Sequence, residues 1–217
     1  MNALNRFRTA LLAACLSATG LTNVQADSAQ SGEAGTGSDP ERWNFRVTLD
    51  DREIGYHNFI RTRLDGVEQV DITAEFEVKV LFITAFRYRH DNTEIWRDSC
   101  LDSIQSETRT NGDLELVSGS RRDSGLRIAT LAGEQEADGC VRTFAYWDRD
   151  LLTATELLNS QTGELTPVRI EALEPRVIRY RGSEIEAQPY RLTGADLKLE
   201  VFYADDRWVG LESTVEG

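Results

Sequence analysis

The sequence predicts a mainly all-β protein, built as a single antiparallel curved sheet or incomplete β-barrel of about ten strands with one short helix. The first observation is the run at residues 70–90, where even-numbered positions are apolar from 70 to 82 and mostly aromatic beyond Thr84, and odd-numbered positions are mostly polar. Side chains alternate between the two faces of a strand, so this period of two indicates extended chain with one buried face. The second observation is a series of two-residue turn signals between alternating segments, such as Asp65-Gly66 and Asn111-Gly112. Connections this short join antiparallel strands, whereas parallel strands need longer crossovers.

The run at residues 70–90 is longer than an ordinary strand. It predicts either one long bent strand or two strands joined without a change of parity. The odd positions Leu81, Ile83 and Ala85 are apolar, so we expect the join there, with both faces of the strand covered. Asp91-Asn92 is expected to turn the chain immediately after the run.

The other strands are predicted from shorter alternating segments bounded by turn residues. They span residues 43–49, 53–64, 94–108, 113–118, 126–131, 165–172, 176–180, 187–193, 196–203 and 208–211. Residues 141–147 are apolar and aromatic. Gly55 indicates a bulge or the close approach of another backbone. Further turns are expected at Asp50-Asp51 and Asp205-Asp206. Residues 148–159 predict the one short helix, with Asp148 as its N-cap and Gly163 beyond its end.

Three segments are predicted along the chain. Residues 1–26 combine two early arginines, an uncharged apolar stretch and a Val-Gln-Ala ending, which is the pattern of a secretory signal peptide. Residues 27–41 are rich in Ser and Gly and predict a disordered tether, because they contain too few apolar residues to form a core. Residues 42–217 then form a single antiparallel β domain. We therefore expect the periplasm of a Gram-negative bacterium as the location.

A second export signal gives an alternative location. The segment Leu-Ala-Ala-Cys that ends at Cys15 resembles a bacterial lipobox, in which this cysteine is lipidated. The protein would then be an outer-membrane lipoprotein held by its acyl chains.

The chain has more acidic than basic residues, which limits the partners that it can bind. The formal net charge is −13, and residues 1–26 contribute two arginines and no acid. A surface this acidic repels nucleic acid and anionic headgroups, so we expect no nucleic-acid partner. The sequence contains no stretch of 18 apolar residues, and we expect no transmembrane segment. The partner is otherwise unknown, with a lipid-like small molecule and an envelope protein as the candidates.

Two cysteines follow the signal peptide, Cys100 and Cys140. They have neither CxxC spacing nor an adjacent histidine, so they predict no metal site and no redox site. An even cysteine count in an exported protein predicts a structural disulfide instead.

Few residues of the sequence carry chemistry. The chain has two histidines, His57 and His90. A catalytic interpretation makes one of them a general base oriented by a nearby acid such as Asp91 or Glu94. Rim or surface positions are the favoured interpretation of both histidines. The sequence contains no nucleophile motif, phosphate loop or calcium loop. We expect no cofactor and no metal, and a non-enzymatic protein is the favoured expectation.

Four segments carry a family resemblance: residues 45–59, 77–112, 145–165 and 190–213. Their strand aromatics, tryptophans and turn glycines resemble an uncharacterised, domain-of-unknown-function family of exported proteobacterial β-proteins. The shape this implies is also similar to the lipoprotein carriers, whose incomplete antiparallel barrel wraps around an apolar cavity. This second likeness is an analogy of fold alone.

An open curved sheet of this kind would use some aromatic and aliphatic side chains to line a ligand groove. The candidates are Phe76, Val78, Val80, Phe86, Tyr88 and Trp96. The first functional hypothesis is a periplasmic, non-enzymatic protein that binds an apolar or amphiphilic ligand on its concave face. The alternatives are an accessory envelope protein that acts by protein–protein contact, and a hydrolase or isomerase that uses His57 or His90 with nearby acids.

Overall fold

The computed structural model describes residues 39–80, 83–195 and 197–213. The predicted signal peptide at residues 1–26 lies outside these residues, as does Cys15. The described strands confirm the all-β class, in antiparallel sheets that curve without closing into a barrel. In this part of the chain, no helix has the length and apolar character needed to cross a membrane.

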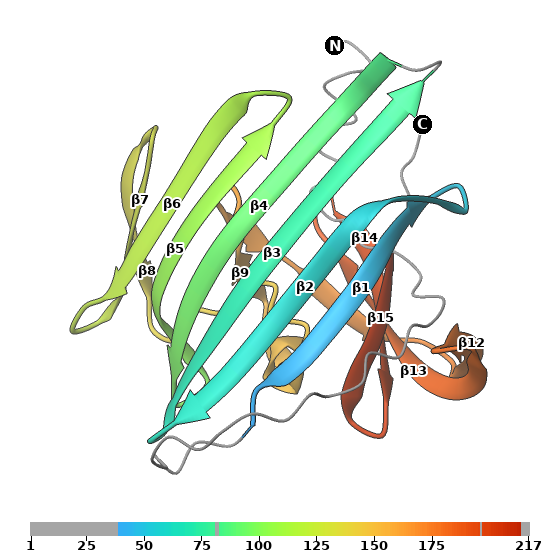
Figure 1. Cartoon of the computed structure of the whole chain (residues 1–217). Helices are drawn as coiled ribbons and strands as arrows, with labels where there is room; N and C mark the ends of the chain where they lie inside the picture. The colour runs from blue at the N-terminus through green and yellow to red at the C-terminus, as the bar shows by residue number, and fades with distance from the viewer. Residues whose placement is uncertain (1–38, 81–82, 196, 214–217) are drawn as a thin grey trace, which may run out of the picture.

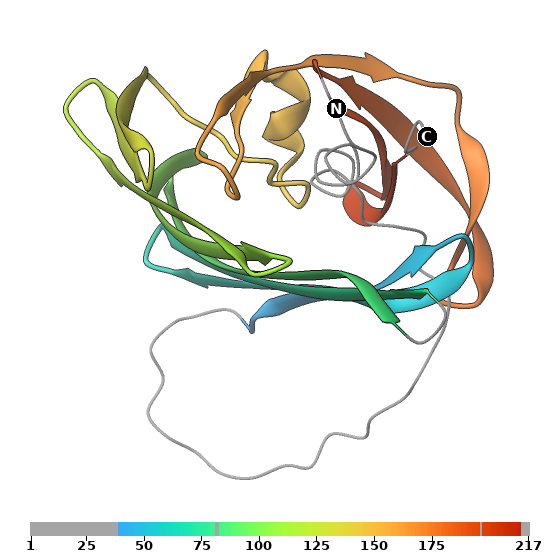
Figure 2. The same cartoon turned by 90° about the horizontal axis from the view of Figure 1, so that it is seen from above.

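Eight consecutive strands form the larger sheet, and each strand pairs antiparallel with the next. They are β1 (Glu41–Leu49), β2 (Arg52–Leu64), β3 (Val67–Val80), β4 (Ile83–Arg97), β5 (Cys100–Thr110), β6 (Asp113–Arg121), β7 (Gly125–Thr130) and β8 (Gly133–Asp138). Figure 1 shows these strands side by side in chain order, with β3 and β4 the longest. Seen from above, the sheet curves around the rest of the domain (Figure 2).

Tight turns with left-handed backbone connect many of the strands. The predicted turns Asp50-Asp51, Asp65-Gly66, Asn111-Gly112 and Asp205-Asp206 are confirmed, and φ is positive at both residues of each. Positive φ at both central positions matches the right-handed twist of the flanking strands. Asp98-Ser99 has the same conformation, although it contains no glycine to signal it.

The run at residues 70–90 is a β-hairpin, which confirms the prediction of two strands with one parity. Even-numbered residues of β3 pair with even-numbered residues of β4, for example Phe76 with Tyr88 and Ala74 with His90. Paired residues share a face, so the same parity points inward on both strands although the chain reverses direction.

Two details of the predicted run were wrong. Ala85 is exposed, so the strand is not covered on both faces there. Leu81 lies outside the described residues. Asp91-Asn92 does not turn the chain, because β4 continues to Arg97. The turn lies at Asp98-Ser99, and it divides the strand that was predicted at residues 94–108.

Gly55 occupies the predicted irregularity in β2. The pairing of β1 with β2 shifts register beside it, between Val47 and Thr48. A Cβ atom at residue 55 would overlap the carbonyl of Glu75 on β3. The glycine therefore permits the close approach of these two backbones.

The predicted helix at residues 148–159 was wrong. Asp148 is an N-cap as expected, and its carboxylate accepts a hydrogen bond from the Asp150 backbone N–H. However, it caps only a 3₁₀ turn, η1 (Arg149–Thr153). The chain then becomes extended in β9 (Glu156–Leu158), which pairs with β10 (Leu165–Pro167).

The C-terminal strands form a second, smaller sheet. Its strands are β11 (Arg169–Ala172), β12 (Arg176–Tyr180), β13 (Ser183–Thr193), β14 (Lys198–Ala204) and β15 (Arg207–Ser213), with β11 and β12 both pairing with β13. Figure 2 shows this sheet facing the concave side of the larger one, with residues 140–167 beside it in the same layer. The structure has more strands than predicted, partly because the short strands at residues 133–138 and 156–158 carry little alternation and partly because residues 165–172 form two strands, β10 and β11.

Aromatic side chains hold the two sheets together. Trp208 of β15 contacts Phe45 and Phe59 of the larger sheet, at ring-centroid distances of 4.5 Å and 5.0 Å. All three rings are buried in one hydrophobic core. Contacts of this type contribute beyond the apolar area they bury, so they fix how the smaller sheet sits over the larger one.

The predicted disulfide between Cys100 and Cys140 is confirmed, with the two Cα atoms 5.1 Å apart. It joins the start of β5 to the segment that follows β8. A backbone hydrogen bond from Leu101 N–H to the Val141 carbonyl, at 2.9 Å, continues the same junction. The disulfide therefore anchors residues 141–147 to the end of the larger sheet.

Candidate functional site

A cavity of about 520 Å³ lies between the concave face of the larger sheet and the segments that cover it. Strands β2, β3 and β4 supply one wall, through His57, Phe59, Ile72, Ala74, Phe76, Tyr88, His90 and Glu94. The covering side consists of residues 143–146, the β9–β10 hairpin and parts of the smaller sheet. Volumes of this size are typical of sites for small organic ligands.

The apolar part of the wall follows from strand parity. Ile72, Ala74 and Phe76 occupy successive even positions of β3, and all three line the cavity. The rings of Phe76 and Tyr88 stack with centroids 5.0 Å apart and planes 11° apart. This stack gives the cavity a flat aromatic surface.

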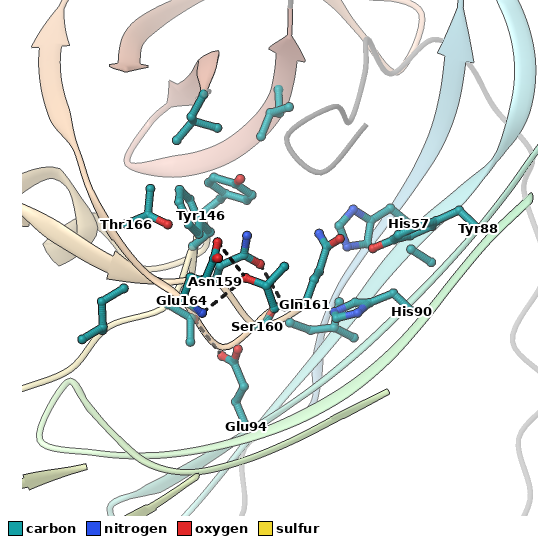
Figure 3. Close-up of a pocket in the computed structure, with 18 of the residues that line it drawn as sticks. His57, Tyr88, His90, Glu94, Tyr146, Asn159, Ser160, Gln161, Glu164 and Thr166 are labelled. Atoms are coloured by element: carbon teal, nitrogen blue, oxygen red, sulfur yellow. Dashed lines mark hydrogen bonds between the residues drawn. The ribbon is translucent and has the colours of Figure 1, made fainter. Parts of the chain in front are cut away.

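The register of the sheet brings the two histidines together. His57 pairs with Ala74, and Ala74 pairs in turn with His90, so the three residues form one row across β2, β3 and β4. Adjacent strands are about 4.8 Å apart, so the two histidines flank the small Ala74 side chain on one face of the sheet. Both histidines line the cavity (Figure 3).

Burial sets the charge of both imidazoles. Desolvation lowers the pKa of His57 to about 3, and the proximity of His90 lowers it further. Desolvation also lowers the pKa of His90 to about 4, against a smaller opposing effect of Asp91. Both side chains are therefore neutral at pH 7.

His90 has a different partner from the one proposed for a catalytic base. Its Nδ1 lies 2.9 Å from the Thr108 hydroxyl oxygen. Asp91 points to the opposite face of β4, where its carboxylate accepts a 2.7 Å hydrogen bond from Arg89. Asp91 therefore does not orient the imidazole. Glu94 lines the same cavity, but its carboxylate is bound by other groups.

Glu94 is a buried acid held in a network of donors. Its carboxylate accepts hydrogen bonds from Asn92 Nδ2 at 2.9 Å, Trp96 Nε1 at 3.0 Å and the Thr143 hydroxyl at 3.1 Å. Burial raises the pKa of Glu94, and the three donors counteract part of that effect. The network ties β4 to the covering segment, so Glu94 fixes one end of the cavity.

The β9–β10 hairpin supplies the polar side of the cavity. The Asn159 side chain shapes its turn by accepting a 2.9 Å hydrogen bond from Gln161 N–H. Figure 3 shows Gln161 extending from this turn toward His57, with Ser160 beside it. Glu164 lies at the exposed margin of the hairpin.

Sequence reasoning missed this hairpin because residues 148–159 were predicted to be helical. The run Asn-Ser-Gln-Thr-Gly at residues 159–163 was the available signal, since these residue types favour turns.

The structure separates the six residues that the sequence suggested for a ligand groove. Phe76 and Tyr88 line the cavity. Val78 and Phe86 belong to the same hydrophobic cluster as Phe76 and Tyr88, but neither of them lines the cavity. The side chain of Val80 lies outside the described part of the structure.

Trp96, the sixth residue, also lies away from the groove. It is buried in the main core against Trp147, with ring centroids 5.3 Å apart. It acts on the cavity only through its hydrogen bond to Glu94.

No group of three or more His, Cys, Asp or Glu side chains within the described residues has an arrangement that could hold a metal ion. His57 and His90 offer two nitrogen ligands, whereas protein sites for zinc use at least three.

A family model described as a domain of unknown function, DUF6134, matches residues 45–217. Comparisons with curated proteins and with solved structures give no match to the chain. The family match begins within β1 and includes every element that lines the cavity. This match confirms the expectation that the chain belongs to an uncharacterised family. The chain thus belongs to the DUF6134 family.

Proposed function

We propose that the protein is a non-enzymatic binding protein that holds an amphiphilic, lipid-like ligand in the cavity between the two sheets. The observation that carries the proposal is the mixed lining of the cavity. The strand wall presents the stacked rings of Phe76 and Tyr88 beside two imidazoles, and the covering side presents the polar turn at residues 159–164 beside apolar residues such as Leu197 and Leu211. The cavity therefore offers apolar surface to a chain and hydrogen-bonding groups to a polar end.

The proposed location is the periplasm. The disulfide between Cys100 and Cys140 supports it, because such bonds persist in oxidising compartments. The signal-peptide pattern at residues 1–26 supports it independently. Native mass spectrometry of protein purified from its own periplasm tests location, processing and bound ligand together.

Filling the cavity at Ala74 is expected to abolish binding. Ala74 is 3% exposed and lies between the two histidines, so Ala74→Trp would place an indole in the cavity. We expect titration with the fluorescent probe N-phenyl-1-naphthylamine to show at least about a ten-fold loss of affinity. Thr73→Trp is the matched control, because Thr73 is the next residue and is exposed on the convex face. Equal affinities for the two variants would contradict the proposed site.

A second candidate function is hydrolysis or isomerisation with a histidine as general base. The observation that favours it is that both histidines line one cavity and have lowered pKa values. A neutral imidazole accepts a proton, as a general base must.

The hypothesis of a hydrolase or isomerase predicts that removing the catalytic imidazole lowers turnover. If His90 is the base, His90→Gln is expected to lower hydrolysis of 4-nitrophenyl laurate about 100-fold or more. The comparison variant is Thr108→Val, which removes only the hydroxyl beside Nδ1. Wild-type turnover no faster than that of the His57→Gln/His90→Gln variant would eliminate catalysis and leave the binding function.

A further inference from the structure

The ionisable side chains that line the cavity carry negative charge or none. Glu94 and Glu164 are acidic, His57 and His90 are neutral at pH 7, and no lysine or arginine is among the lining residues that the structure describes. A carboxylate or phosphate entering this space would lose its hydration without gaining a counter-ion. That desolvation is costly for a charged group and modest for a hydroxyl or ester.

Arg61 is a cation on the wall strand β2, but its interactions lie outside the cavity. Arg61 shares the inward parity of His57 and Phe59 on β2, yet it does not line the cavity. Its guanidinium donates two 2.9 Å hydrogen bonds to Glu68 and lies 4.4 Å from the centre of the Trp147 ring. A bidentate pair of this kind holds the arginine in place, so Arg61 is not available to a ligand in the cavity.

The cations of the β3–β4 hairpin lie on its convex face. Arg87 and Lys79 both pair with Glu77, at 2.7 Å and 2.6 Å, and Arg89 pairs with Asp91 at 2.7 Å. All five are odd-numbered, so strand parity directs them away from the cavity. The β3–β4 hairpin therefore keeps these cations away from its ligand-facing surface.

Apart from Glu94 and Glu164, the polar groups that line the cavity are uncharged hydrogen-bonding groups. They include the imidazoles of His57 and His90, the amides of Gln135, Asn159 and Gln161, and the hydroxyls of Thr143, Ser160, Thr162 and Thr166. Each amide and hydroxyl can both donate and accept, and a neutral imidazole does one on each nitrogen. Such a set matches hydroxyl, ester and amide groups.

We propose that the ligand is an uncharged amphiphile, of the class of long-chain alcohols and acylglycerols, and that the cavity excludes fatty acids and other anionic amphiphiles. This inference rests on the proposed binding function and specifies its ligand class. The described lining carries it, because it combines acidic residues and uncharged hydrogen-bonding groups with no lysine or arginine.

The test uses three probes that share a twelve-carbon chain: 1-dodecanol, monolauroylglycerol and laurate. Each is titrated at pH 7.5 against the full-length protein loaded with N-phenyl-1-naphthylamine. The alcohol and the acylglycerol are expected to displace the fluorophore with apparent Kd values at least about ten-fold below that of laurate. Laurate binding as tightly as dodecanol would overturn the ligand class and leave the binding function standing. Failure of the fluorophore and all three probes to bind would overturn both.

A charge variant provides a second measurement. Thr166 lines the cavity, so Thr166→Lys adds the missing cation there. It is expected to narrow the preference for dodecanol over laurate to about three-fold or less. Thr73→Lys is the control, because it adds the same charge on the convex face and should leave the preference unchanged. An unchanged preference in Thr166→Lys would also overturn the proposal.

Discussion

Lowering the pH from 7 to 5 is expected to destabilise the fold by about 3 kcal/mol through His57 and His90. The pKa values of these histidines are about 3 and about 4 in the folded protein, against about 6.5 in an unfolded chain. Between these values the unfolded chain binds more protons than the folded one. Acidification therefore favours unfolding, and the stability is lost as pH falls below about 6.5.

Other titrating groups near the cavity act in a different direction. Burial raises the pKa of Glu94, so protonation of this carboxyl favours the folded state as the pH falls. Burial likewise raises the pKa of Asp148. The net slope of stability against pH therefore contains opposing contributions, and a variant is needed to isolate the histidines.

The double variant His57→Gln/His90→Gln isolates the contribution of the histidines to the pH dependence of stability, because the chain has two histidines in all. Urea denaturation at pH 7 and pH 5 gives the free energy of unfolding of each protein. The wild type is expected to lose about 3 kcal/mol more than the variant over this range. Equal losses would show that the imidazoles titrate as they do in the unfolded chain, which contradicts their burial in the cavity wall.

Alternation predicted much of the sheet but could not predict its register. The even-numbered residues of 70–90 were expected on one buried face, and Ile72, Ala74, Phe76 and Tyr88 lie there. Alternation reports which face a residue occupies and carries no information on which residues of two strands are opposite. The meeting of His57 with His90 depends on the pairing of both with Ala74, so only the structure could show it.

The errors in the prediction also have physical causes. Asp91-Asn92 has turn-forming residue types, but within β4 the side chain of Asp91 binds Arg89 and that of Asn92 binds Glu94. Partners on the same strand thus replaced the local backbone contacts that favour turns.

The wrong helix at residues 148–159 has a different cause. Its leucines fit helical spacing, yet Leu157 and Leu158 are buried in the core as part of β9. Tertiary packing overrode local pattern there. The polar hairpin of the cavity was missed for the same reason.

Removing the disulfide is expected to have the largest effect on stability, a loss of about 4 kcal/mol. Cys100 and Cys140 are 40 residues apart in sequence, and a cross-link that closes a loop of this length restricts the unfolded chain strongly. The measurement is urea denaturation of Cys100→Ala/Cys140→Ala at pH 7. Adding a reductant should lower the stability of the wild type to that of the variant and leave the variant unchanged.

The disulfide also connects stability to the cavity. It anchors residues 141–147, which include Thr143, Phe144 and Tyr146 of the cavity lining. The hydrogen bond from Thr143 to Glu94 is a second anchor for the same segment. Ligand binding should therefore weaken in the cysteine variant under conditions where the protein is still folded, because the covering side is held less firmly. Unchanged probe affinity in the folded variant would show that the disulfide is not needed to position this segment.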